Sequence, residues 1–327
     1  MRKILNTKDF VLGTFASNCS GGMSVTKVPE RWRNTWDNNL RLARMLDDAG
    51  IDFMLPIARW IGYGGETDFH GDVLETVTWA AGLLASTRHL TVFATVHTAA
   101  NHPAVVAKQI ATMDQMGQGR AGLNIVAGWN RPEYEALGLP LATGHTERYT
   151  YAQEWFDVVQ KIWEHEGRFD TDGKNFKLKG IYGLPKPVGA ERPPILNAAG
   201  SGEGRDFAVR NADFLFTPAI DLERSRQEVA ALKQKGLEAG RSPQVLTFSH
   251  VVCRPTEKEA RDYLQHFGQD NADWAAVDNL VALQFANAHS FPHDLLALIR
   301  DRMAAGHGGF PLVGTPEQVA DGICALA

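Results

Sequence analysis

The 327-residue chain has few cysteines, no long apolar run and no block of like charges. Its three cysteines, Cys19, Cys253 and Cys324, lie far apart and have neither metal-ligand nor redox-motif spacing. We therefore expect free thiols in a reducing cytoplasm. Asn, Lys and Asp interrupt the apolar residues of the N-terminus, which argues against a signal peptide. No apolar run approaches the length of a membrane span.

Several chemical motifs are also missing. The net charge of −5 and the lack of a basic stripe argue against a nucleic-acid partner. The sequence contains neither a Walker A motif nor a Gly-x-Ser-x-Gly nucleophile elbow. Its histidines form no metal-ligand helix spacing with carboxylates, so we expect no metal. These absences leave an ordinary globular composition, 44% hydrophobic and 22% charged.

The chain alternates short apolar segments with long helical patterns. Strands are predicted at residues 10–15, 51–56, 90–95, 121–126, 194–198, 213–216 and 244–252. Helices are predicted at about 31–49, 74–86, from 103 onward, 147–165, 202–211, 221–238 and 256–267. Such repeated strand–helix units without a linker favour an α/β fold of the (β/α)8 TIM-barrel type.

We expect one domain over residues 1–327 with two insertions, at about 168–183 and 269–303. The first insertion includes a hairpin over 169–181, because Asp-Gly occupies positions 172–173. The final strand of the barrel is not apparent, since the last helical pattern begins after Thr315 and runs to Ala327. We expect that the chain lacks its natural end rather than that the barrel closes abnormally.

The most informative segment is 121–134, a buried strand followed by a loop rich in functional side chains. Asn124 lies within the apolar run, where a polar side chain needs a hydrogen-bonding reason to be buried. Trp129 and Glu133 follow near the end of the strand. Polar residues at the carboxyl end of a barrel strand indicate a ligand site.

Two other strand ends carry similar signals. Three glycines among residues 62–65 permit close approach to a ligand, although a flexible loop has the same composition. Strand alternation places Thr95 and His97 on one face of the strand over 90–95 and its continuation. Thr95 is either a ligand-binding hydroxyl or an ordinary strand former, and His97 alone is more typical of a structural residue.

Small residues between a strand and a helix, over 198–205, suit a phosphate at a helix N-terminus. Arg148 and Tyr149 would add a cation and a hydroxyl, unless they are a surface pair at the start of a helix. The glycine spacing departs from the dinucleotide fingerprint by one residue. Asp221, about twenty residues on, nevertheless keeps an NAD-linked Rossmann alternative open.

Taken together, these stretches resemble the bacterial luciferase-like flavin monooxygenases, including the branches that oxidise pyrimidines, sulfones and alkanesulfonates. The resemblance runs from about residue 10 to the C-terminus. It is carried by residues 62–69, 94–95, 108–114, 124–129, 132–134 and 147–149. Residues 20–27 resemble the sulfone branch.

The resemblance implies roles for specific residues. It implies FMN contacts by Ala58, Arg59, Asn124, Glu133, Arg148, Tyr149 and Ser201. It implies an oxygen pocket formed by Leu55, Thr95, Asn124 and Trp129. Arg59 stands where the family has lysine. His97, a candidate substrate contact, stands where the pyrimidine branch has a small residue, which counts against a pyrimidine substrate.

The implied activity is that of a two-component monooxygenase. It would take reduced FMN from an NAD(P)H:flavin reductase and use O2 to oxygenate a small polar substrate with C–S or C–N cleavage. Asn124 N–H and Thr95 O–H would stabilise negative charge on oxygen, while Leu55 and Trp129 would exclude water. Two alternatives remain on this fold: deazaflavin-dependent hydride transfer and non-catalytic flavin binding. We expect a cytoplasmic homodimer or homotetramer with no membrane partner.

Overall fold

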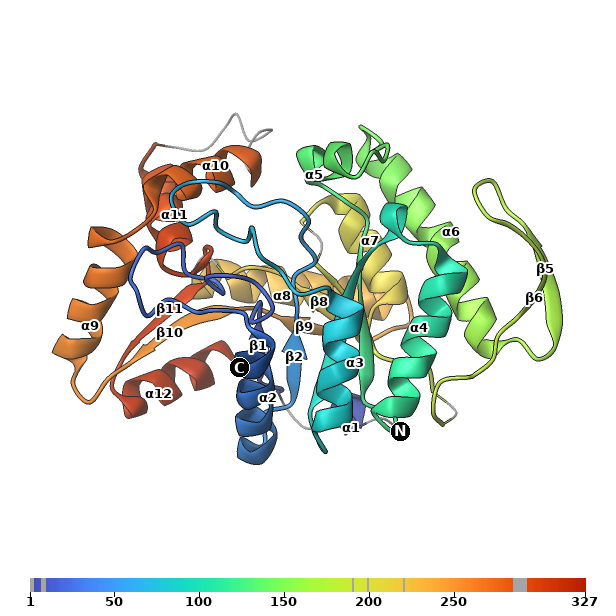
Figure 1. The fold of residues 1–327 in the computed structure, drawn as a ribbon, viewed down its shortest axis with the longest axis horizontal. Helices are drawn as coiled ribbons and strands as arrows, with labels where there is room; N and C mark the ends of the chain where they lie inside the picture. Colours follow the sequence, from blue (N-terminus) through green and yellow to red (C-terminus); the bar gives the residue numbers. More distant parts are fainter. Residues whose placement is uncertain (1–2, 7–9, 190, 199, 220, 285–292) are drawn as a thin grey trace.

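The computed structural model describes residues 3–6, 10–189, 191–198, 200–219, 221–284 and 293–327. Its main feature is a curled, parallel, seven-stranded sheet in the order β1-β2-β3-β4-β7-β8-β9 (Figure 1). The strands are β1 (Gly13–Phe15), β2 (Phe53–Leu55), β3 (Thr91–His97), β4 (Ala121–Val126), β7 (Ile195–Ala198), β8 (Phe214–Phe216) and β9 (Gln244–Leu246). Seven strands in chain order form a half-barrel of the TIM-barrel type.

Helices connect the strands and cover the outer face of the sheet (Figure 1). They are α2 (Trp36–Ala49), α3 (Thr76–Ser86), α4 (Pro103–Met116), α6 (His145–Glu164), α7 (Gly202–Asn211) and α8 (Leu222–Glu238). Two short helices lie beyond strand ends: η1 (Thr98–Ala100) and α5 (Arg131–Ala136). At the N-terminus, α1 (Lys3–Asn6) places Ile4 in the inner cluster of the sheet.

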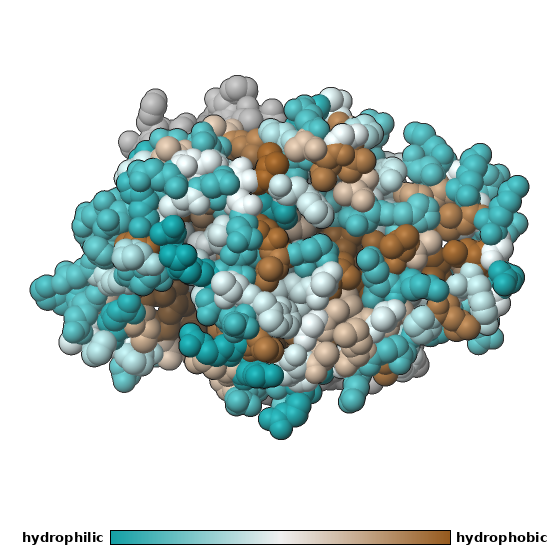
Figure 2. All heavy atoms as spheres, in the orientation of Figure 1, coloured by the Kyte–Doolittle hydropathy of each residue, from teal (hydrophilic) through white to brown (hydrophobic). Residues whose placement is uncertain are grey.

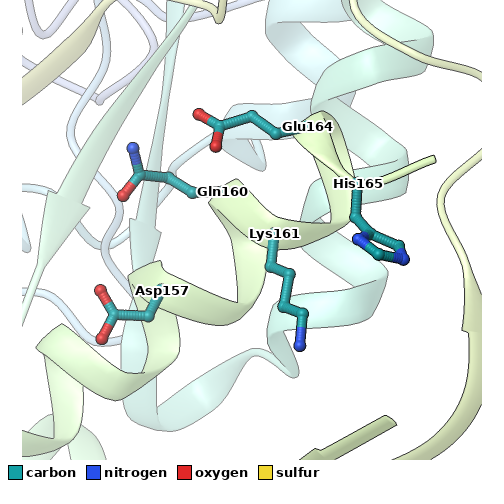
Figure 3. A pocket seen from close by; sticks show the side chains of 5 residues that line it. All are labelled: Asp157, Gln160, Lys161, Glu164 and His165. Atoms are coloured by element: carbon teal, nitrogen blue, oxygen red, sulfur yellow. The ribbon is translucent and has the colours of Figure 1, made fainter. Parts of the chain in front are cut away.

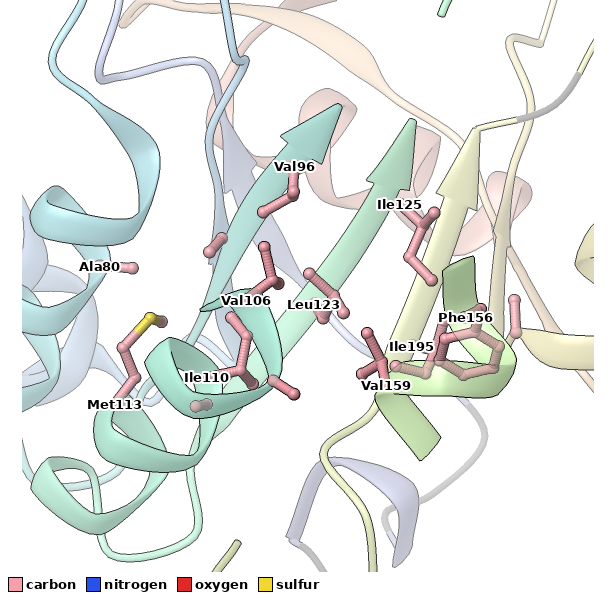
Figure 4. Packing of buried hydrophobic residues seen from close by; sticks show 14 of the residues in the cluster. Ala80, Val96, Val106, Ile110, Met113, Leu123, Ile125, Phe156, Val159 and Ile195 are labelled. Atoms are coloured by element: carbon pink, nitrogen blue, oxygen red, sulfur yellow. The ribbon is translucent and has the colours of Figure 1, made fainter. Parts of the chain in front are cut away.

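The main hydrophobic core lies between the sheet and these helices. Figure 4 shows Val106 and Ile110 of α4 facing Val96 of β3 and Leu123 of β4. A second cluster fills the concave face, with Phe53, Leu55, Phe93, Leu196, Phe214 and Leu246. Because alternate strand residues enter different clusters, both faces of the sheet are buried, as parallel sheets require. This explains why the strands read as nearly continuous apolar runs.

The ends of several helices are fixed by local hydrogen bonds. Thr35 caps α2, and Gly50 ends it in the left-handed region with φ of 77°. The side chain of His102 caps α4, whose first residue is Pro103. The sequence pattern extended the first long helix back to residue 31, but the Thr35 cap begins it at Trp36.

Two segments lie outside the seven-stranded sheet. The first contains an antiparallel pair, β5 (Arg168–Asp172) with β6 (Lys177–Tyr182), which confirms the predicted hairpin. The second contains α9 (Glu257–Gln265), the π-helical turn η2 (His266–Asp270), α10 (Trp274–Gln284) and α11 (His293–Gly306). The range predicted as an insertion, 269–303, contains α10 and most of α11, while residues 285–292 lie outside the described residues.

The seventh predicted strand is divided in the structure. After β9 the chain continues as β10 (Ser249–Cys253), which pairs in parallel with β11 (Phe310–Gly314) outside the main sheet. The sequence pattern missed β11, because Pro311 and two preceding glycines obscure the apolar run. The helix α12 (Pro316–Leu326) follows. Among the described residues no strand bridges β9 and β1, in agreement with the expected lack of a final barrel strand.

The surface is polar over most of the face seen in Figure 2, and its hydrophobic residues form several separate groups. A search of the described residues finds no helix that combines the length and the apolar character needed to cross a bilayer.

Candidate active site

The carboxyl ends of β2, β3 and β4 bring together most of the residues that the sequence pattern selected. In β4, Leu123 and Ile125 enter the outer core, so alternation places Asn124 on the concave face. In β3, Phe93 enters the inner cluster, so Thr95 and His97 share that face. Thr95 is the register partner of Asn124. The predicted proximity of these polar residues is therefore present in the structure.

Asn124, Thr95 and Pro56 form a buried chain of hydrogen bonds. Asn124 Nδ2 donates to Thr95 Oγ1 at 3.1 Å, and Thr95 Oγ1 donates to Pro56 O at 2.5 Å. Asn124 Oδ1 is buried and has no hydrogen-bond partner within the described part of the chain. Because Pro56 O takes the only hydroxyl hydrogen of Thr95, the second N–H of Asn124 is the donor that remains. A buried polar atom without a partner indicates a place that a ligand completes.

Glu133 and Arg59 form a buried ion pair between α5 and the loop after β2. Arg59 Nη1 lies 3.2 Å from Glu133 Oε2, and their side chains are 6% and 0% exposed. Trp60 N donates to Glu133 Oε1 at 2.7 Å. Burial raises the pKa of Glu133, although Arg59 and the Trp60 N–H lower it. Glu133 thus holds Arg59 and the loop backbone, whether or not it also contacts a cofactor.

Two aromatic rings flank the Arg59 guanidinium. Its central carbon lies 5.2 Å from the ring centroid of Tyr63 and 5.3 Å from that of Trp129. Cation–π contacts of this kind stabilise a charge that has lost water. Trp129 remains 39% exposed, and Tyr63 is buried with an unpartnered hydroxyl. Trp129 therefore lies at the outer edge of the cluster, consistent with its position after the strand.

His97 is buried at the end of β3. Its ring stacks on Tyr134, with centroids 5.7 Å apart and 9° between the planes. Its Nδ1 lies 3.9 Å from Glu133 Oε2, beyond hydrogen-bond distance. Burial, with a smaller effect of Arg59, lowers the pKa of His97 to about 3. His97 is therefore neutral near pH 7 and packs within the site as an uncharged ring.

A second group gathers at the start of α6 and α7. The Ser201 side chain caps α7 and accepts from Gly204 N at 3.1 Å. Burial raises the pKa of Tyr149, while Arg148 and a hydrogen bond with Ser201 lower it. Arg148 donates to Ala142 O at 2.7 Å and Thr143 O at 3.2 Å, and its Nε is buried without a partner. A helix N-terminus beside a cation and hydroxyls suits a phosphate.

The other two predicted residues, Leu55 and Ala58, lie at the end of β2 and in the loop that follows, on either side of Pro56. Leu55 is 2% exposed and belongs to the inner cluster at the end of β2. Ala58 is half-buried in the loop that follows. Leu55 thus places an apolar side chain near the Pro56–Thr95–Asn124 hydrogen bonds, whereas Ala58 has little side chain to contribute.

Sequence reasoning missed several buried polar residues around this loop. Asn18 donates to Ile57 O at 2.8 Å and accepts from Ile57 N at 3.0 Å, which fixes the backbone beyond β2. Tyr63, His70 and His307 have buried atoms without partners. Asn197, like Asn124, is a polar residue within an apolar strand, so the sequence pattern could have identified it. It shares the outer face with Ile195 and donates to Ile125 O at 2.7 Å, which indicates a structural role.

The outer helical layer also has surface hollows, which are separate from the candidate active site. One is lined by charged and polar side chains from the outer side of α6 and its C-terminal end, as Figure 3 shows. These residues are Asp157, Gln160, Lys161, Glu164 and His165. They belong to the helical layer and not to the carboxyl ends of the strands. No group of three or more metal-ligating side chains was found in the part of the chain that the structure describes.

Fold and site together define an α/β enzyme of the TIM-barrel type with a buried polar site at the carboxyl edge of its sheet. The comparison with protein families then identifies it more closely. Residues 11–327 match the model of the luciferase-like monooxygenases, and the chain belongs to this family. It is a flavin-dependent monooxygenase by family.

Individual relatives support this assignment. The chain is 32% identical to the "FMNH(2)-dependent dimethylsulfone monooxygenase" of Pseudomonas fluorescens (strain Pf0-1), covering 94% of this chain and 84% of the relative. It is 29% identical to "Pyrimidine monooxygenase RutA" of Acinetobacter baylyi, covering 83% and 73% respectively. The crystal structure of riboflavin lyase (RcaE) has the same fold, with a TM-score of 0.84 at 23% identity over 98% of this chain and 85% of that chain.

Proposed function

We propose that this protein is the oxygenating component of a two-component system that uses reduced FMN and O2 on a small polar substrate. The observation that carries this is the Asn124–Thr95–Pro56 chain, which leaves one amide N–H and the Oδ1 of Asn124 unpaired at the strand ends. The family assignment and the similarity to an FMNH(2)-dependent dimethylsulfone monooxygenase support reduced FMN as the cofactor.

The residues present fit a flavin mononucleotide. The unpartnered Oδ1 of Asn124 matches the polar edge of a flavin ring, and the α7 N-terminus with Ser201, Tyr149 and Arg148 suits its phosphate. Reduced FMN, when bound, supplies electrons for the activation of O2. The residues that would hold the cofactor are Ala58, Arg59, Asn124, Glu133, Arg148, Tyr149 and Ser201.

The side chains around the site would then act in distinct ways. The remaining N–H of Asn124 stabilises negative charge that develops on oxygen, because it is a fixed, neutral donor in a buried setting. Thr95 fixes the orientation of the Asn124 amide. Leu55 and Trp129 limit the access of water. Arg59, oriented by Glu133, presents a cation at the edge of the site.

The substrate is one whose oxygenation leads to C–S or C–N cleavage. An NAD(P)H:flavin reductase would supply the reduced FMN as a transient partner, a role that the FMNH(2) dependence of a relative supports. We also propose that residues 1–327 act as one domain with two insertions, and that the protein is a homodimer or homotetramer, which light scattering after size exclusion would test. We further propose a cytoplasmic location, which the three free cysteines support.

The central test measures product formed per FMNH2 consumed. Photoreduced FMN, O2 and a panel of sulfones, sulfonates and cyclic amides are mixed with the protein, and flavin absorbance and product are followed together. Asn124→Ala should lower the product yield per FMNH2 at least tenfold while flavin oxidation continues. Asn175→Ala, in the exposed β5–β6 turn, should behave like the parent. An unchanged yield in Asn124→Ala would refute the role of the amide.

A further inference from the structure

A cluster of buried rings, formed by Tyr63, His70 and His307, lies beside Arg59, which Tyr63 contacts, and its two histidines have no role in the proposed function. The rings of His70 and His307 are 5.9 Å apart between centroids and 15° from parallel. Tyr63 lies 5.9 Å from His70 and also contacts Arg59. We call these three residues the histidine cluster. They come from the loop after β2 and from the segment between α11 and β11.

The hydrogen-bond partners define the form of each imidazole. His70 Nε2 lies 2.6 Å from Gly22 O, and a carbonyl oxygen only accepts, so Nε2 carries the hydrogen. His307 Nε2 lies 3.0 Å from the amide nitrogen of Gln284, which donates, so Nε2 of His307 accepts. In neutral rings, His70 Nδ1 is consequently an acceptor and His307 Nδ1 carries a hydrogen.

Both histidines are neutral near pH 7. Burial, together with nearby His307 and Arg59, lowers the pKa of His70 well below its ordinary value. Burial and Arg59 lower the pKa of His307 to about 4. The Glu133 carboxylate pairs with Arg59, and neither imidazole forms an ion pair with a carboxylate among the described residues.

The two Nδ1 atoms and the Tyr63 hydroxyl are buried and have no hydrogen-bond partner among the residues that the structure describes. Leaving one such polar atom unpaired costs about 1–3 kcal/mol. The backbone is also unusual, because His70 and His307 have φ of 60° and 52°, in the left-handed region that non-glycine residues rarely adopt. Unpaired polar atoms on strained backbone are typical of ligand sites and atypical of packing.

We propose that the histidine cluster is the substrate-recognition subsite and that it selects a neutral group with adjacent donor and acceptor atoms, such as an amide, lactam or imide. The N–H of that group would donate to His70 Nδ1, and its carbonyl oxygen would accept from His307 Nδ1–H. The two nitrogens belong to rings whose centroids are 5.9 Å apart and whose planes are 15° from parallel. This inference rests on the proposed function, whose substrate class it narrows towards C–N bonds.

The same geometry disfavours sulfones and sulfonates. Their oxygens only accept hydrogen bonds, so they satisfy His307 Nδ1–H but leave His70 Nδ1 unpaired. A site built for a donor rejects an analogue that lacks it, because a buried polar atom then stays without a partner. The Tyr63 hydroxyl both donates and accepts, so it does not by itself distinguish these classes.

Three cyclic probes of similar size test this complementarity. 2-Pyrrolidinone has a donor and an acceptor, N-methyl-2-pyrrolidinone lacks the donor, and sulfolane is a sulfone with acceptors only. Binding to the full-length protein is followed by NMR of 15N-labelled histidine, with and without FMNH2 under anaerobic conditions. We expect 2-pyrrolidinone to bind about tenfold more tightly than the other two and to shift the nitrogen signals of His70 and His307.

Variants test the atoms separately. His70→Phe removes the acceptor and should abolish the preference for 2-pyrrolidinone over its N-methyl analogue. His307→Phe should weaken both lactams, and His307→Asn should restore part of the affinity. His165→Phe, on the outer end of α6, should retain the parent's preference.

The outcomes separate the two proposals. Protein that fails to bind FMNH2 but still discriminates the probes contradicts the proposed function and supports the subsite. Equal binding of the three probes to the parent protein, or an Nδ1–H form of His70 in the NMR spectrum, overturns the subsite assignment even if every variant misfolds.

Discussion

The buried Arg59–Glu133 pair gives the most quantitative prediction. Removing the charge of Glu133 by Glu133→Gln leaves the Arg59 cation 6% exposed with no compensating carboxylate. At 3.2 Å, two unit charges attract by about 5 kcal/mol in a medium of effective dielectric about 20. Part of this attraction is offset by the desolvation of both groups. We expect the free energy of unfolding to fall by about 3 kcal/mol.

A double-mutant cycle isolates the interaction. Arg59→Met alone should also destabilise the protein by about 3 kcal/mol, since Glu133 then lies buried without its cation. The double variant Arg59→Met, Glu133→Gln removes both charges, so its loss should be smaller than the sum of the two by about 2–3 kcal/mol. The hydrogen bond from Trp60 N to Glu133 Oε1 can survive as a bond to the glutamine oxygen.

The assay is urea unfolding at pH 7, followed by tryptophan fluorescence and circular dichroism in parallel. Lys27→Met and Glu66→Gln provide a matched exposed pair, 3.0 Å apart, whose coupling should be below about 1 kcal/mol. If the losses of Arg59→Met and Glu133→Gln simply add, the two charges do not stabilise each other and the reasoning about the loop after β2 is wrong.

Three further changes test other parts of the structure. Burial holds the pKa of His97 at about 3 in the folded state, so unfolding takes up a proton below pH 6.5 and the free energy of unfolding decreases as the pH falls. His97→Phe should reduce the decrease in the free energy of unfolding between pH 7.5 and 5 by about 2 kcal/mol, measured by urea unfolding. Gly128→Ala should lower the thermal midpoint more than Gly138→Ala, because φ is positive at both but only at Gly128 would Cβ lie 2.5 Å from Tyr134 Oη. Asp273→Ala removes two acceptor contacts to the loop after β2, at 2.7 and 2.8 Å, and should speed limited proteolysis of that loop; an unchanged cleavage rate would contradict this anchoring role.

Much of the fold follows from local patterns in the sequence. The strand at 121–126 is predicted to the residue, because its apolar run is bounded on both sides by glycine- or polar-rich loops. β3 runs two residues beyond its predicted end, since Val96 and His97 still pair with Ile125 and Val126. The sequence analysis placed Thr95 and His97 on one face of this strand and its continuation, and the pairing with β4 fixes where the strand ends.

Other elements depend on contacts that no local pattern contains. The predicted strand at 244–252 divides near Phe248, whose ring packs against Phe15 and Phe216 of other strands. β11 exists because it pairs with β10, although Pro311 lowers its strand propensity. Tertiary contacts override propensity at both places.

The residues of the candidate site also differ in how far the sequence alone predicts their contacts. The family resemblance placed Asn124 and Thr95 in one pocket, and the register of β3 and β4 makes them direct partners in the structure. Strand parity fixes the face of each side chain but not its register. Arg59 and Glu133 are 74 residues apart, and His70 and His307 still further, so their meeting is a property of the folded chain. The sequence marks such residues only as polar groups in loops. The Nδ1 atoms of His70 and His307 are buried and have no partner among the described residues, and the same is true of Asn124 Oδ1. This shared property, together with the contact of Tyr63 with Arg59, connects the proposed oxygen-activating centre with the proposed substrate subsite.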